Sequence, residues 1–212
     1  HKTRPSIALH FGTIFKTYTP AGIVSGSELR KRLEDRPEVQ SYAWPSFMQG
    51  MNQKTYGIRL GELDVFTSGS GMGKTTLIKQ LQHHFMQTTD LNQALIHLEE
   101  PLEETAEGLI GIHIGKRLNL PDVREYVADA DYWKGFDETF GAVDADGNSR
   151  LNVYDAFGSL DETDLYNKVR YFATGLGCKV IWIDHLSILV SDLGSESQDE
   201  RRAIDSIMHN LK

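Results

Sequence analysis

The strongest chemical signal in the sequence is a glycine-rich loop at residues 68–75, Ser-Gly-Ser-Gly-Met-Gly-Lys-Thr. Glycines let successive backbone N–H groups point inward around phosphate oxygens at the start of a helix. In such a loop Lys74 supplies positive charge for the β- and γ-phosphates, and the Thr75 hydroxyl is placed for Mg²⁺. The usual pattern begins with glycine where this chain has Ser68. We therefore predict a nucleotide-binding site rather than a glycine-rich turn that binds nothing. The predicted nucleotide-binding residues are Ser68, Gly69, Ser70, Gly71, Met72, Gly73, Lys74, Thr75 and Thr76.

Two acidic positions follow apolar runs that are typical of buried parallel strands. Val-Ile-Trp-Ile at 180–183 ends in Asp184, which we expect to face the phosphates and hold Mg²⁺ through water. The run 94–98 ends in Glu99 and Glu100. Hydrolysis needs a base near the γ-phosphate, and Glu99 is the candidate because it comes first after the strand. From spacing alone, the competing interpretation is that both glutamates only complement a helix dipole, as Glu100 is expected to do.

Other candidate sites in the sequence are weaker. Acidic residues at 144–148 suggest a Ca²⁺ loop, but Ser149 stands where the loop needs glycine, so a surface turn is favoured. His83 and His84 are adjacent on a predicted helix and should point apart, which argues against joint metal binding. His97 and His185 flank the predicted site, where packing or hydrogen-bonding roles are favoured. We therefore predict no metal cluster besides the Mg²⁺ at Thr75 and Asp184.

These residues need a sheet and helices to position them. From Gly61 onward short apolar runs alternate with helical periods, which indicates βαβ units and a mainly parallel sheet between helices, an α/β fold. The predicted strands are Glu62–Thr67, Ala94–Leu98, Leu151–Tyr154 and Lys179–Asp184. The predicted helical stripes contain Leu77, Leu81 and Phe85; Leu102, Ala106, Leu109 and Ile110; Leu165, Val169 and Phe172; and Ile204, Ile207, Met208 and Leu211.

The first 45 residues differ from the rest, because they hold four of the six prolines. We predict a linker at 1–45 and the main domain at 46–212. Within the linker, Ser25 or Ser27 can cap a short helix that runs to Arg36, and its narrow apolar stripe needs a partner surface. No stop signal ends the last helix, so we expect the sheet to continue beyond Lys212 and the domain to be incomplete there.

Composition sets broader limits on the class of protein. A net charge of −8 excludes an overall basic surface, so any DNA contact must be local. The single cysteine, Cys178, excludes an internal disulfide and fits a cytoplasmic protein. The apolar runs are shorter than the about 20 residues that a membrane helix needs, so we expect no membrane association. Because the chain begins with His1, we expect it to be part of a longer protein.

Three segments carry a resemblance to a known family. Residues 61–76, Gly-Glu-Leu-Asp-Val-Phe-Thr-Ser-Gly-Ser-Gly-Met-Gly-Lys-Thr-Thr, 98–107, Leu-Glu-Glu-Pro-Leu-Glu-Glu-Thr-Ala-Glu, and 175–187, Gly-Leu-Gly-Cys-Lys-Val-Ile-Trp-Ile-Asp-His-Leu-Ser, resemble the helicase half of phage primase-helicases. Bacterial DnaB and mitochondrial Twinkle are relatives of that family. The resemblance covers roughly residues 20–212, and the phage-type loop has the same serine as Ser68. It implies a RecA-like P-loop NTPase core that hydrolyses ATP or a dNTP.

The resemblance also implies roles and partners. Lys74 and Thr75 become the phosphate and Mg²⁺ residues, Glu99 the base that activates water, and Asp184 the acid that holds Mg²⁺ through water. The linker helix resembles the one by which each subunit of a homo-hexamer docks on its neighbour. Single-stranded DNA passes through the ring, where backbone N–H groups of Gly194 and Ser195 are candidate phosphate contacts, although the surrounding loop is acidic.

The family also has parts that this sequence lacks. A sensor histidine, basic DNA-contacting loops and an arginine finger are expected after Lys212, and a primase half before His1. The isolated chain is therefore expected to be inactive in turnover, and the whole protein to act in the host cytoplasm with its primase and a polymerase at the replication fork. Two alternatives stay open: a RecA- or KaiC-like ATPase with another role, and an oligomeric scaffold that binds nucleotide without hydrolysing it.

Overall fold

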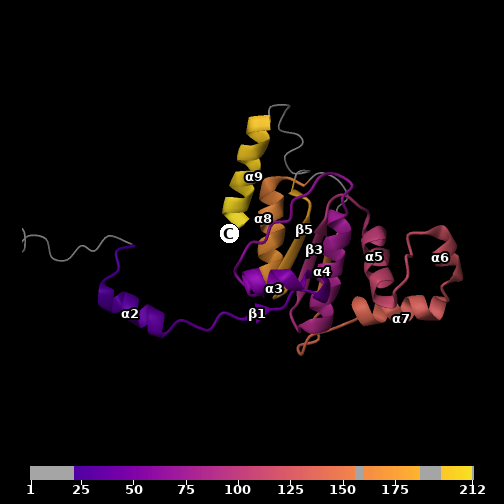
Figure 1. Cartoon of the computed structure of the whole chain (residues 1–212), viewed down its shortest axis with the longest axis horizontal. Coiled ribbons are helices and arrows are strands. Elements are labelled where there is room, and N and C mark those ends of the chain that lie inside the picture. Colours follow the sequence, from indigo (N-terminus) through magenta and orange to yellow (C-terminus); the bar gives the residue numbers. More distant parts are fainter. Residues whose placement is uncertain (1–21, 156–159, 187–196, 212) are drawn as a thin grey trace, which may run out of the picture. The chain divides into compact units, whose positions relative to one another are not determined.

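The computed structural model describes residues 22–155, 160–186 and 197–211 (Figure 1). The chain forms two compact units, His1–Val39 and Gln40–Lys212. The domain division expected between residues 45 and 46 stays a prediction. Gly194 and Ser195, the candidate DNA contacts, lie outside the described residues.

Helix α2, Gly26–Glu34, is the described helix of the first unit. It begins where expected, because the Ser25 hydroxyl accepts a hydrogen bond from the Glu28 N–H at 3.2 Å and so caps the first turn. Leu29 is 52% exposed and Leu33 is 60% exposed. All residues of α2 are described, and none of them is buried. The predicted capped helix is confirmed, although it ends at Glu34 rather than at Arg36, and its apolar stripe faces solvent in this structure.

The second unit is built on a parallel sheet of strands β3, Gln93–His97, β4, Leu151–Tyr154, and β5, Val180–Asp184, in the order β4-β3-β5. Gln93 lies opposite both Leu151 and Val180, and His97 lies opposite Asp184. Every residue of β3 is buried, as its central place in the sheet requires. Three of the four predicted strands are therefore confirmed, with bounds that shift by at most one residue.

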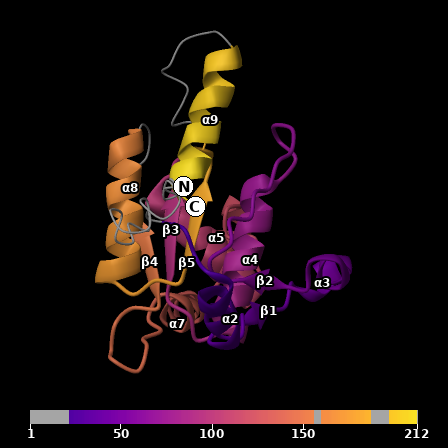
Figure 2. The ribbon, with the colours of Figure 1, turned by 90° about the vertical axis from the view of Figure 1, so that its left-hand side faces the viewer.

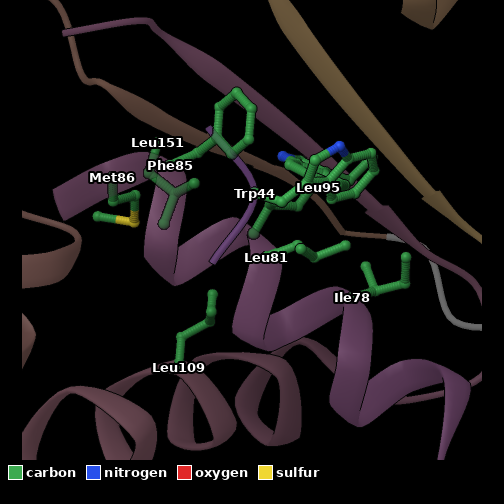
Figure 3. Packing of buried hydrophobic residues seen from close by; sticks show 9 residues of the cluster. Trp44, Ile78, Leu81, Phe85, Met86, Leu95, Leu109 and Leu151 are labelled. Atoms are coloured by element: carbon green, nitrogen blue, oxygen red, sulfur yellow. The ribbon is translucent and has the colours of Figure 1, made fainter. Parts of the chain in front are cut away.

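Helices α4, Lys74–Thr88, and α5, Leu102–Ile114, lie on the same face of this sheet. Their apolar side chains form a core with residues from all three strands (Figure 3); its buried members are Trp44, Ile78, Leu81, Phe85, Met86, Leu95, Leu109, Leu151 and Trp182. The ring centroids of Phe85 and Trp182 are 5.7 Å apart in an edge-to-face contact. This packing holds α4, the helix that follows the glycine-rich loop, directly on β5.

Helix α8, Glu162–Arg170, with its π-helical continuation η2, Tyr171–Gly175, and helix α9, Ser197–Leu211, cover the opposite face. Figure 2 shows α8 and α4 on the two sides of the sheet. The second core contains Ala94, Ile96, Leu98, Leu160, Leu165, Phe172, Cys178 and Ile207. Leu95 enters the first core while its neighbours Ala94 and Ile96 enter the second, as the alternation along a strand dictates.

Short elements surround this sandwich. Strand β1, Ser41–Tyr42, pairs antiparallel with β2, Ile58–Arg59, and between them lie η1, Ser46–Met48, and α3, Gln49–Thr55. Helices α6, Pro121–Tyr126, and α7, Asp129–Thr139, follow α5. Helix α7 packs closely on α5 at Gly135, where an added Cβ would lie 2.7 Å from Ile114 Cγ2. Glycine is therefore required for this approach of the two helices.

The predicted strand at Glu62–Thr67 is wrong. Within the described part of the chain, this segment pairs with no strand and has no regular structure. Leu63 and Val65 are exposed, and Phe66 packs against Trp44, with ring centroids 5.9 Å apart. A strand needs a ladder partner, and apolar alternation along the sequence cannot show whether one is present. The glycine-rich loop therefore follows a segment that has no regular structure and pairs with no described strand.

Candidate active site

The glycine-rich loop ends in a helix start that is suited to an anion. Gly71 and Gly73 have φ angles of 73° and 83°, a left-handed region that side-chain-bearing residues avoid. Gly73 is the N-cap of α4, and no side chain caps this end of the helix. The first N–H groups of α4 therefore remain available beside the positive end of the helix dipole. The loop residues 68–73 are exposed, as a ligand-binding loop must be.

Lys74 bends back over this loop. Its Nζ donates a hydrogen bond to the Ser68 carbonyl at 3.3 Å, so the ammonium lies close to the backbone at the start of the loop. Thr75, the next residue, is half-buried in the first turn of α4, and Thr76 is exposed. Lysine, hydroxyl and backbone N–H groups thus meet at the start of one helix, which is the set that a phosphate with a bound cation requires.

The two acidic candidates lie side by side at the ends of neighbouring strands. His97 of β3 lies opposite Asp184 of β5, and the Leu98 N–H donates to the Asp184 carbonyl at 2.7 Å. Asp184 is 4% exposed. Glu99 follows one residue later; its side chain is 45% exposed, and its Oε1 contacts His185 Nε2. A buried and an accessible carboxylate therefore occupy the carboxyl edge of the sheet, where ligands of α/β proteins bind.

A contact across the fold brings the start of α4 to this same edge. Lys79, in the second turn of α4, places its Nζ 2.6 Å from Oε1 of Glu100, which directly follows Glu99. The loop before α4 and the carboxyl end of β5 lie at the same end of the sheet (Figure 1). Lys74 and Thr75 at the start of α4, and Glu99 and Asp184 beside the ends of β3 and β5, therefore lie at the same end of the sheet, although they come from three separate segments of the sequence.

Glu100 has a different environment from Glu99. It accepts hydrogen bonds from Lys79, from His97 Nδ1 at 3.0 Å and from the Thr105 hydroxyl at 2.8 Å. Burial opposes ionisation of Glu100, but the hydrogen bonds from His97, Lys79 and Thr105 and the charge of Lys79 outweigh it and lower the pKa to about 2. Glu100 is therefore a member of a buried cluster that is charged at neutral pH, rather than an exposed dipole partner.

The donor set fits Mg²⁺ better than a metal that needs many protein ligands. Within the described residues no group of three or more His, Cys, Asp or Glu side chains is arranged to hold a metal ion. Mg²⁺ usually keeps several waters and is bound through one or two carboxylates together with phosphates. Asp184 and the Thr75 hydroxyl match that requirement. They are the residues that would hold the ion.

The features set aside in the sequence behave as expected. The Asp144 carboxylate accepts hydrogen bonds from the backbone N–H groups of Asp146 and Asn148, at 3.0 and 2.9 Å, and from the Asn92 side-chain amide at 2.7 Å, so this segment is a surface turn anchored at Asn92. His83 and His84 point apart. His83 Nε2 lies 3.1 Å from His113 Nδ1 on α5, whereas His84 Nε2 lies 2.9 Å from the Ala43 carbonyl.

Sequence reasoning missed the buried polar residues behind the site. Lys79 and Gln82 of α4 are buried. The sequence indicates only that His97 flanks the site, but its Nε2 lies 2.8 Å from Gln82 Nε2, so His97 belongs to the same buried group. The sequence holds one sign of this, because Lys79, Gln82 and Met86 are spaced as one helical face. A lysine on such a face is more often solvated than buried, so the pattern alone does not reveal the cluster.

Comparisons with known proteins identify the family and the fold. The family model described as DnaB-like helicase C terminal domain matches residues 44–212. A DNA helicase/primase of Enterobacteria phage T3 is 36% identical over 199 residues, which make up 92% of this chain and 34% of that protein. The chain thus spans about a third of the length of this curated relative.

A solved structure described as an ATPase domain supports the fold. It matches with a TM-score of 0.61 and 18% identity, over 86% of this chain and 65% of that one. The expected RecA-like α/β fold is confirmed. No helix in the described ranges is long and apolar enough to cross a bilayer. With most of its residues matched by the family model, the chain belongs to the family of DnaB-like helicase C-terminal domains.

Proposed function

We propose that this chain binds a nucleoside triphosphate, ATP or a dNTP, and hydrolyses it to drive a replicative helicase along single-stranded DNA. The observation that supports the proposal is the register that sets Asp184 opposite His97, two residues before Glu99, at the edge of the sheet to which the Lys79–Glu100 ion pair ties α4, the helix that begins at Lys74. Membership of the DnaB-like family and the similarity to a phage helicase/primase support the coupling of hydrolysis to DNA unwinding.

Nucleotide binding falls to the start of α4. The free N–H groups after Gly73 and the Lys74 ammonium hold the β- and γ-phosphates. The Thr75 hydroxyl and the Asp184 carboxylate would hold Mg²⁺, which, when bound, neutralises charge on the phosphates. Asp184 is well suited to this, because a buried carboxylate at the end of a strand has a fixed position.

Glu99 is the residue that activates water. It is exposed enough to receive a water molecule, and it lies two residues beyond His97, the register partner of Asp184. Glu99 takes a proton from the water, the water oxygen bonds to the γ-phosphorus, and the bond from that phosphorus to the β–γ bridging oxygen breaks to release the nucleoside diphosphate and phosphate. The His185 imidazole contacts one oxygen of the Glu99 carboxylate and helps to orient it.

The assembly is also part of the proposal. We propose a homo-hexamer in which the exposed Leu29 and Leu33 of α2 are buried on a neighbouring subunit. Single-stranded DNA would run through the ring, with Gly194 and Ser195 as candidate phosphate contacts. The DNA helicase/primase similarity supports work beside a primase and a polymerase at the fork, in the cytoplasm of the host cell.

The test compares Glu99→Gln with a matched control in the full-length protein. Glutamine keeps the size of the side chain but takes no proton, so DNA-stimulated phosphate release should fall at least about a hundredfold while binding of a labelled ATP analogue is retained. Glu103→Gln makes the same change at an exposed position four residues away and should leave both unchanged. Normal hydrolysis by Glu99→Gln would contradict the assignment. Wild-type binding without any turnover would indicate the scaffold alternative.

A further inference from the structure

Behind the exposed Glu99 lies a buried cluster centred on Glu100. Three elements each send one donor to its carboxylate: α4 sends Lys79, β3 sends His97 and α5 sends Thr105. The Lys79 and Glu100 side chains are 10% and 16% exposed, and that of His97 is 2% exposed. Buried charged groups are rare in proteins and are costly unless they are paired. Here every partner of Glu100 comes from an element that must be placed correctly for the proposed chemistry.

The polar contacts continue into the core. The Gln82 side-chain N–H donates to His97 Nε2 at 2.8 Å, which leaves His97 Nδ1 as the donor to Glu100. Gln93 Nε2 donates to the backbone carbonyl of Gln82 at 3.4 Å, and Trp182 Nε1 donates to Gln93 Oε1 at 2.7 Å. A hydrogen-bonded chain therefore joins the residue after Glu99 to the middle of β5, the strand that ends in Asp184.

The fold makes space for the lysine of this cluster. A Cβ added at Gly108 of α5 would lie 2.5 Å from Lys79 Nζ, so glycine is the residue that lets the lysine stem pass between α4 and α5. The Lys79 ammonium also donates to the Glu104 carbonyl at 3.3 Å, in the first turn of α5. The Glu100 carboxylate and the Glu104 carbonyl thus hold the Lys79 ammonium where α4 packs on α5. The position of Lys79 is set by packing as well as by charge.

The consequence concerns the neighbouring residue. Glu99 and Glu100 share a peptide bond, and the Glu99 side chain itself is half exposed, with His185 as its described contact. The position of the Glu99 carboxylate relative to the phosphate loop therefore depends on the contact with His185 and on the backbone of Glu99, which Glu100 ties to the second turn of α4. We propose that Glu100 is a positioning residue: with Lys79, His97 and Thr105 it fixes the Glu99 carboxylate relative to the nucleotide. This inference rests on the proposed role of Glu99 as the base.

A double-mutant cycle in the full-length protein tests it. Glu100→Gln should lower kcat for DNA-stimulated hydrolysis about tenfold and leave KM and the affinity for an ATP analogue within twofold, because the nucleotide-binding groups are untouched. In the Glu99→Gln background the same change should have no further effect on kcat, since Glu100 acts through Glu99. If the two losses multiply, or if Glu100→Gln alone is as active as the wild type, the positioning role is wrong.

A milder pair of variants covers the case in which Glu100→Gln does not fold. Thr105→Val removes one donor to Glu100, and Thr139→Val removes a hydroxyl that is equally buried but bonds the Gly135 carbonyl of α7, at 2.8 Å. Both should lower thermal stability, but only Thr105→Val should lower kcat, by about two- to fivefold at constant KM. Equal kcat values for the two would refute the proposal. Full hydrolysis by Glu99→Gln would instead overturn the proposed function itself.

Discussion

The charge of Glu100 should make the stability of the chain depend on pH in a defined way, and Glu100→Gln should remove that dependence. In the folded chain the pKa of Glu100 is lowered from its ordinary value of 4.5 to about 2, because hydrogen bonds from His97, Lys79 and Thr105 outweigh the effect of burial. The folded state therefore binds the proton less tightly than the unfolded state does. The resulting stabilisation is fully present above the unfolded-state pKa and is lost as pH falls toward about 2.

The size of the effect follows from the two pKa values. A change from 4.5 to about 2 corresponds to at most about 3 kcal/mol of unfolding free energy at pH 7, and solvent at the edge of the cluster screens part of it. The same relation leaves about half of this at pH 3, where the unfolded state is already protonated but the folded state is still ionised. Glutamine carries no charge at any pH and leaves the Lys79 ammonium without its buried partner. The unfolding free energy of the wild type should therefore exceed that of Glu100→Gln by about 2–3 kcal/mol at pH 7.

Urea unfolding of the 212-residue chain between pH 3 and pH 7 measures this difference. Glu103→Gln is the matched control, since Glu103 is exposed in the first turn of the same helix, α5, and its removal should change the unfolding free energy by less than about 0.5 kcal/mol at every pH. A gap between wild type and Glu100→Gln that stays the same from pH 7 to pH 3 would refute the reasoning, because it would mean that the carboxylate is not held in its charged form.

Three other changes have expected outcomes. Lys74→Ala removes a charge-assisted phosphate contact and should weaken ATP-analogue binding ten- to a hundredfold, about 1.5–3 kcal/mol, in a fluorescence titration; unchanged affinity would remove Lys74 from the site. Leu81→Ala opens a cavity at a fully buried position and should cost about 2–5 kcal/mol in urea unfolding, whereas a cost below about 1 kcal/mol would contradict the packing of α4 on the sheet. Leu29→Ser with Leu33→Ser should leave thermal unfolding unchanged, because both are exposed, yet abolish rings of the full-length protein in sedimentation; intact hexamers would refute the docking role of α2.

Much of the fold is readable from local patterns. The strands β3, β4 and β5 are short, largely apolar runs. The helices on the two faces of the sheet have apolar stripes, and residues of these stripes are buried in the two cores. A strand that is buried on both faces of a sheet needs a continuous apolar run, so this pattern can be recognised without knowing its partners. The segment 62–67 has a similar pattern and forms no strand, because its pairing depends on a partner elsewhere in space rather than on its own residues.

The site divides in the same way between local and distant causes. The glycines, lysine and threonine of the glycine-rich loop lie within eight consecutive residues, so a role in phosphate binding can be predicted from their spacing alone. The sequence predicts that Asp184 and Glu99 are acids at the ends of strands. Whether the two residues lie near each other depends on the register between β3 and β5. That register is set by the packing of whole helices and strands.

The difference between Glu99 and Glu100 was settled only by tertiary structure. In the sequence they are neighbouring acids before a proline, with nothing to separate their environments. In the fold one is exposed beside His185 and the other is enclosed by donors from α4, β3 and α5. Charges of buried groups depend on partners that are distant in sequence, since the low polarity of the interior strengthens every such contact. The sequence by itself determined which residue types lie at the candidate site, and folding decided which of the two acids is exposed and which is enclosed.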